Sequence, residues 1–188
     1  GGGLAQILAT VCVILVFKSR NFAVGITLKK TEVILTALVG LILIGEGVST
    51  ISMFLICLGG AGVFFISKKV SSVDRSNFSI LNKSAVYGLL SGLLFAISAV
   101  CYRSATLSVV SDLVYLRAGF TLLIVILSQS FVMTIWLALF EPGQIKLVWL
   151  ERKKGFWVGV TSLGGSFFWF TAFTLQNAAY VKAVGPIE

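Results

Sequence analysis

Long apolar runs, separated by short polar stretches that hold most of the Lys and Arg residues, constrain this sequence more than any other feature. A helix needs about 20 residues to cross the hydrocarbon core of a bilayer. Several runs are near that length, at residues 4–17, 22–44, 51–66, 85–101, 113–140 and 156–175. Charged residues make up only 12% of the chain, about half the fraction in a soluble domain. We therefore expect an all-α transmembrane fold with about six to seven spans.

Composition excludes several kinds of site. The sequence has no His, and each of its three cysteines, Cys12, Cys57 and Cys101, lies inside an apolar run. This set offers no metal-ligand spacing and no relay of nucleophile and base. We expect no metal, no cofactor and no enzymatic activity. The net charge of +8 comes from Lys and Arg spread over loops, so nucleic acid is not an expected partner.

The polar stretch at residues 68–84 predicts a linker loop between two blocks of spans, residues 1–67 and 85–188. A second loop is expected at residues 141–155, between the fifth and sixth apolar runs. The chain opens on Gly-Gly-Gly and stops inside an apolar run. We expect it to be an internal fragment of a longer protein.

Two charge-bearing apolar segments are related by a constant shift along the sequence. A shift of 156 positions lays Asn21 on Asn177 and Glu32 on Glu188, and it also lays the first apolar run over the sixth. Spans that are an odd number of crossings apart traverse the membrane in opposite directions. This register predicts an inverted-topology repeat, which many secondary transporters contain.

Three segments and one arginine carry a resemblance to a known family. "TEVILTALVGLILIGEGVSTISMFLICLGGAGVFFI" resembles the fourth and fifth helices of the EamA-like, ten-helix members of the drug/metabolite transporter superfamily. "VYGLLSGLLFAISAVCYR" is similar to the sixth helix, and "FWFTAFTLQNAAYVKAVGPIE" to the eighth helix running into the ninth. Arg117 matches an arginine early in the seventh helix.

The resemblance implies a ten-helix bundle of two inverted five-helix halves (5+5). Residues 1–67 would hold helices three to five, and residues 85–188 would hold helices six to eight and the beginning of the ninth. It also implies a carrier, with an exporter expected, in the bacterial inner (plasma) membrane. The expected partners are the lipid bilayer and a small polar metabolite, such as an amino acid, nucleoside, sugar or drug-like molecule.

Charges inside the second run are the sharpest candidates for a substrate site. If this span begins near Phe22, then Lys29, Lys30 and Glu32 lie about 10–15 Å along it. Charges at that depth usually face a watery cavity and mark a pathway. The other interpretation starts the span at Thr31 and leaves both lysines in a loop.

The end of the chain adds further candidates for the substrate site. Lys182 and Glu188 lie in an apolar run, although Lys182 is also close enough to the start of its span to reach the interface. Tyr180, like Trp169, combines a flat apolar ring with one donor, which suits the orientation of a small solute. With Asn177 and Arg117, these residues complete the predicted substrate-binding set.

Glycines at helical spacing predict close packing of helices. Gly88 and Gly92 form a GxxxG pair, and Gly59 and Gly60 lie in "LGGAG". Small residues at this spacing let two helix backbones approach, within one chain or between two copies of a homodimer. A second hypothesis follows, in which the protein is a non-transporting membrane assembly or scaffold subunit that packs through these faces.

Loop charges and family topology disagree about orientation. Alternate loops place twelve basic residues on one side of the membrane and three, Arg103, Arg117 and Lys182, on the other, which makes the first side cytoplasmic. The usual topology of the family makes that side the outside. Both orientations are retained.

Overall fold

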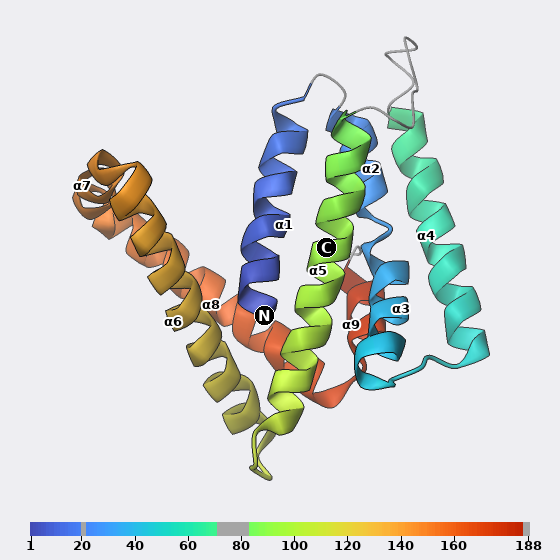
Figure 1. Ribbon diagram of the computed structural model, residues 1–188. Coiled ribbons are helices and arrows are strands. Elements are labelled where there is room, and N and C mark those ends of the chain that lie inside the picture. Colours follow the sequence, from blue (N-terminus) through green and yellow to red (C-terminus); the bar gives the residue numbers. More distant parts are fainter. Residues whose placement is uncertain (20–21, 71–82, 186–188) are drawn as a thin grey trace. The chain divides into compact units, whose positions relative to one another are not determined.

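The computed structural model describes residues 1–19, 22–70 and 83–185, and these segments form helices and no strand. The helices are α1 (Gly2–Phe17), α2 (Phe22–Lys29), α3 (Glu32–Ile44), α4 (Thr50–Val70), α5 (Lys83–Ser108), α6 (Val114–Phe140), α7 (Pro142–Leu150), α8 (Arg152–Leu175) and α9 (Ala178–Val184) (Figure 1). They form two compact units. The first comprises Gly1–Ser104 with Gln176–Glu188, and the second comprises Ala105–Leu175.

Three of the described helices, α5, α6 and α8, are long and apolar enough to cross a membrane. The segments Gly2–Phe17 and Thr50–Gly62 are shorter apolar helices. The prediction of an all-helical fold with membrane-length helices is confirmed for the described residues. The five-plus-five inverted arrangement stays a prediction.

The second apolar run forms two helices. α2 ends at Lys29 and α3 begins at Glu32. The interpretation with one helix over 22–44 is therefore wrong, and the alternative that starts a helix at Thr31 is off by one residue, although Lys29 belongs to α2 and not to a loop. The last turn tightens, because the amides of Lys30 and Thr31 bond to carbonyls three residues back. The Thr31 hydroxyl also donates to the carbonyl of Leu28, at 2.7 Å. These local bonds satisfy the end of α2 and stop it.

In the first unit, α2 and α3 follow one another along α5 (Figure 1). Glycines make this approach possible. A Cβ added at Gly88 would clash with the carbonyl oxygen of Gly25, and one at Gly92 would come within 3.1 Å of that of Lys29. The GxxxG face of α5 therefore packs against the backbone of α2 and of the break that follows it.

The α3, α4 and α9 helices meet in a small apolar core formed by Ala37, Ile56 and Ala179. Gly45 ends α3 with a φ of 67°, a left-handed conformation that glycine adopts without strain. The turn sends the chain toward α4. It also places Glu46 beside α3, because the Glu46 amide donates to the carbonyl of Gly40.

The fourth run extends beyond its predicted end at Tyr102 and Arg103, because α5 continues to Ser108. Arg103 is therefore a helical residue and not a loop charge. On either side of the predicted linker at 68–84, α4 reaches Val70 and α5 starts at Lys83. Residues 71–82 lie outside the part of the chain that the structure describes.

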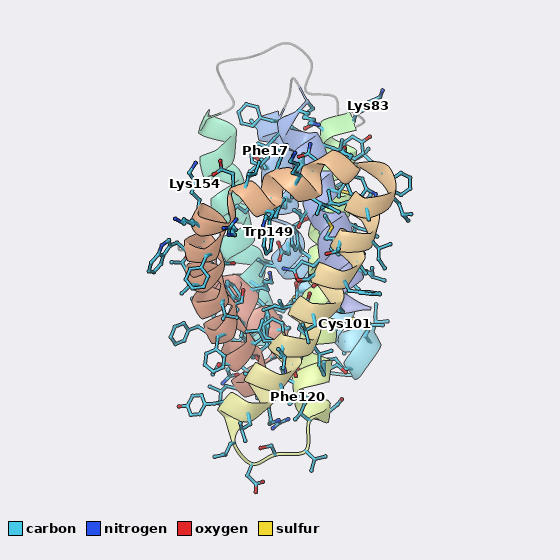
Figure 2. The ribbon with its side chains drawn as sticks, turned by 90° about the vertical axis from the view of Figure 1, so that its left-hand side faces the viewer. Phe17, Lys83, Cys101, Phe120, Trp149 and Lys154 are labelled. Carbon is cyan, nitrogen blue, oxygen red and sulfur yellow. The ribbon has the colours of Figure 1, made fainter. Side chains whose placement is uncertain are left out.

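The second unit pairs α6 with α8, and α7 connects them. The segment 141–155 was expected to be a loop, but Pro142 starts α7, since a proline at the first helical position has no amide to satisfy. Figure 2 shows Trp149 on α7 and Lys154 at the start of α8. The Arg152 guanidinium lies 5.2 Å from the centre of the exposed Trp149 ring. Exposed aromatic and basic groups together are typical of a membrane interface.

Candidate functional site

A partly buried group of charges forms where α2, α3, α5 and α9 meet. Nζ of Lys182 lies 2.6 Å from Oε1 of Glu32, and the two side chains are only 21% and 12% exposed. The fully buried Oε1 has no aligned hydrogen bond among the described residues, so Lys182 neutralises it through charge. The ring of Phe95 lies beneath two ammonium groups, at 4.8 Å from Nζ of Lys29 and 5.8 Å from that of Lys182. We call Lys29, Glu32, Phe95 and Lys182 the charge cluster.

The charge cluster lies halfway along a helix of membrane length. Phe95 is 12 residues after Lys83 and 13 before Ser108, the two ends of α5. At about 1.5 Å per residue, the cluster is roughly 18–20 Å from either end. Charges at this level are costly in a bilayer and are usually paired or face a cavity. Here the carboxylate and the aromatic face supply the compensation.

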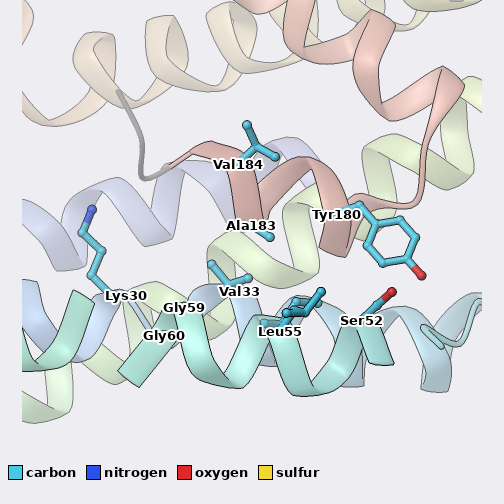
Figure 3. A pocket seen from close by; sticks show the side chains of 10 residues that line it. Lys30, Val33, Ser52, Leu55, Gly59, Gly60, Tyr180, Ala183 and Val184 are labelled. Atoms are coloured by element: carbon cyan, nitrogen blue, oxygen red, sulfur yellow. The ribbon is translucent and has the colours of Figure 1, made fainter. Parts of the chain in front are cut away.

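A pocket of about 470 Å³ lies next to the charge cluster, between α3, α4 and α9. Its lining residues come from these helices and from the break between α2 and α3: Lys30, Val33, Ser52, Leu55, Ile56, Gly59, Gly60, Tyr180, Ala183 and Val184. Figure 3 shows Lys30 at one end and Ser52 and Tyr180 at the other. The middle is apolar. Pockets of this size commonly hold a small molecule.

Ser49 contacts both hydroxyl residues, Ser52 and Tyr180, at one end of the pocket. The Ser49 amide donates to the phenol oxygen of Tyr180 at 3.4 Å, and the Ser49 and Ser52 hydroxyl oxygens are 2.8 Å apart. At the other end, Gly59 lines the pocket, and an added Cβ there would meet no atom within 4 Å. A Cβ at Gly60 would lie 3.6 Å from Cδ1 of Ile34. Gly59 therefore widens the pocket, whereas Gly60 also packs on α3.

A second ion pair, between Glu46 and Arg103, connects the end of α3 to α5. The Arg103 guanidinium donates to both carboxylate oxygens of Glu46, at 2.8 and 2.9 Å. The Asn177 amide donates to the carbonyl of Glu46 at 3.4 Å, and its side-chain oxygen caps α9 through the amide of Ala179. Glu46 thus joins the end of α3, the helix α5 and the start of α9. Such two-pronged Arg–carboxylate pairs are among the strongest in proteins.

The structure brings six of the predicted substrate-binding residues into the first unit: Lys29, Lys30, Glu32, Asn177, Tyr180 and Lys182. Arg117 and Trp169 belong to the second unit. There Arg117 donates to the carbonyl of Thr106 at 2.9 Å, and the Trp169 ring lies 5.7 Å from that of Phe173. Glu188 lies outside the residues that the structure describes.

Sequence reasoning missed Phe95, Ser52 and the partnership of Glu46 with Arg103. A signal for Phe95 was present, because it follows Gly92 by three residues and so shares the face of the GxxxG pair. Ser52 and Glu46 carry no comparable local signal. Their roles depend on α9 and α5, far along the chain.

Comparison of the chain with protein-family models, with curated proteins and with solved structures finds no match.

Proposed function

We propose that the protein is a membrane carrier that moves a small polar metabolite by alternating access. The observation that carries this proposal is the interrupted helix α2–α3, with its charge cluster halfway along the membrane-length helix α5. Many secondary transporters bind substrate near the membrane midplane at such interruptions. A pocket of about 470 Å³ beside the cluster offers room for a solute.

The shift of 156 positions that predicts an inverted repeat gives further support. α2 begins at Phe22 and α9 begins at Ala178, which is the shift of 156 positions found in the sequence. Both are short helices that carry a lysine, and both contribute to the charge cluster. The resemblance to EamA-like carriers favours the same function and an inner-membrane location. A gradient of protons or of substrate would drive transport, since the sequence has no nucleotide-binding motif.

The scaffold hypothesis draws less support from the structure. It needs the GxxxG face of α5 to be available to another protein, yet Gly25 of α2 occupies the face at Gly88.

The test is solute flux by the full-length protein in proteoliposomes. Uptake or counterflow of amino acids, nucleosides and sugars is measured for the wild type and for Glu32→Gln. We expect saturable flux of at least one class, reduced tenfold or more in the variant because the buried lysines lose their counter-charge. Glu151→Gln, in an exposed pair with Lys154, is the matched control. Absence of flux from folded protein across a broad panel would refute the carrier.

A further inference from the structure

Among the described residues, basic groups outnumber acidic groups in and around the pocket. In the part of the chain that the structure describes, three ammonium groups, from Lys29, Lys182 and the pocket residue Lys30, lie at or beside the break, against the one carboxylate of Glu32. These described residues leave a net charge of about +2 at the level where a bilayer has few counterions. An anionic group in the pocket would reduce this excess.

Lys30 is the lining residue that can meet such an anion. Lys29 and Lys182 lie over Phe95, and Lys182 also lies against Glu32. Lys30 instead follows the end of α2, is exposed, and lines one end of the pocket (Figure 3). An ammonium on a flexible stem forms charge-assisted hydrogen bonds with carboxylate or phosphate oxygens.

The rest of the pocket sets the shape of its occupant. Val33, Leu55, Ile56 and Ala183 form an apolar middle. Ser52 and Tyr180 place two hydroxyls at the far end (Figure 3). Along α4, the pocket runs from Ser52 to Gly60, which is about 12 Å at 1.5 Å per residue.

We propose that the pocket binds an amphipathic organic anion. Its acidic head lies at Lys30, its apolar body lies along Leu55 and Ile56, and a hydrogen-bonding group at its other end meets Ser52 and Tyr180. This inference rests on the proposed carrier function and narrows its substrate class from small polar metabolites to elongated anions with an apolar centre.

The test compares three probes that share a phenol end and a four-carbon chain, and that differ in the charge of the group at the end of the chain. They are 4-(4-hydroxyphenyl)butanoate, its neutral amide, and the corresponding amine. Equilibrium binding to the full-length protein in nanodiscs is measured for each. We expect the carboxylate to bind at least tenfold more tightly than the amide, and the amine to bind weakest.

Two pairs of variants assign the binding to this pocket. Lys30→Met should remove the preference for carboxylate over amide, whereas Lys18→Met, outside the pocket, should keep it. Gly59→Leu should weaken binding of both carboxylate and amide, because its side chain fills the pocket. Gly62→Leu is the matched control, since Gly62 also has open space around it but does not line the pocket.

The outcomes separate this inference from the proposed function. Binding of amide or amine as tight as that of the carboxylate overturns the inference, as does a preference that survives Lys30→Met or a failure of all three probes to bind. Flux of a neutral or cationic solute with no effect of Lys30→Met overturns the inference and supports the carrier. Carboxylate binding that depends on Lys30, without flux, supports the site and overturns the carrier.

Discussion

Glu32 and Lys182 form an ion pair at 2.6 Å although 150 positions of sequence separate them. The pair joins the first turn of α3 to α9. Both side chains are largely buried, so each charge depends on the other for its compensation. This relationship makes the stability of the first unit sensitive to either residue.

Removing one member of this pair should cost more than removing both. Glu32→Gln removes the carboxylate that lies against Lys182, and we expect the free energy of unfolding to fall by about 3 kcal/mol. The double variant Glu32→Gln/Lys182→Met removes both charges and should recover part of that loss. Reversible unfolding in mixed micelles provides the measurement. If the double variant loses the sum of the two single losses, the residues are not coupled.

Arg103 should not be replaceable by lysine. Its guanidinium reaches both oxygens of Glu46, whereas a lysine offers a single ammonium and loses this geometry. We expect Arg103→Lys to destabilise the protein nearly as much as Arg103→Gln. A double-mutant cycle with Glu46→Gln should give a coupling energy of about 1–3 kcal/mol. A coupling near zero would contradict the prediction.

Gly88 should not tolerate even one added methyl group. The Cβ of Gly88→Ala would clash with the backbone carbonyl oxygen of Gly25, so α2 and α5 must separate. We expect a marked loss of folded yield and a lower unfolding temperature. Gly159→Ala is the matched control in α8, because its Cβ would meet nothing within 4 Å. It should stabilise the helix by about 0.5–1 kcal/mol. Equal effects of the two variants would contradict the close contact.

Trp149 should lie at the level of the lipid head groups. α7 connects two candidate membrane spans, and Trp149 and Arg152 are adjacent and exposed on it and on the following helix. A variant that keeps only this tryptophan is placed in bilayers whose lipids carry bromine at shallow or deep positions. Shallow bromines should quench its fluorescence more strongly. A variant that keeps only Trp136, on α6, provides the comparison, and stronger quenching of Trp149 by deep bromines would refute the prediction.

The helical class of the fold could be predicted because it depends on apolar runs, which are local in sequence. The Asn177 side chain caps the start of α9, and an Asn before a helix is a local signal of the same kind. α7 was mistaken for a loop. Its Pro-Gly start suggests a turn, but a proline can also open a helix, and the sequence alone did not distinguish the two.

The candidate site was only partly predictable. Lys29, Glu32 and Lys182 stood out because charges in apolar runs are costly. Their mutual arrangement did not, because the pairing of Glu32 with Lys182 depends on how α9 packs against α3. Arg103 was interpreted as a loop charge because its pairing also depends on a residue far away in the sequence. Its partner Glu46 lies 57 positions earlier, and no pattern within α5 identifies it.

The ion pair between Glu32 and Lys182 has a consequence for biosynthesis. The ribosome makes Lys29 and Glu32 long before it makes Lys182, and at about 5–20 residues per second the interval is on the order of 10–30 s. In the proposed carrier the segment of α2 and α3 is a span, and a lysine at the centre of a nascent span opposes insertion by roughly 2.5–3.5 kcal/mol. The Phe95 ring, which contacts Lys29 in the folded protein, is made only when α5 emerges. Until then Lys29 lacks this partner as well. The segment should therefore enter the bilayer late, held at the translocon until its partners arrive.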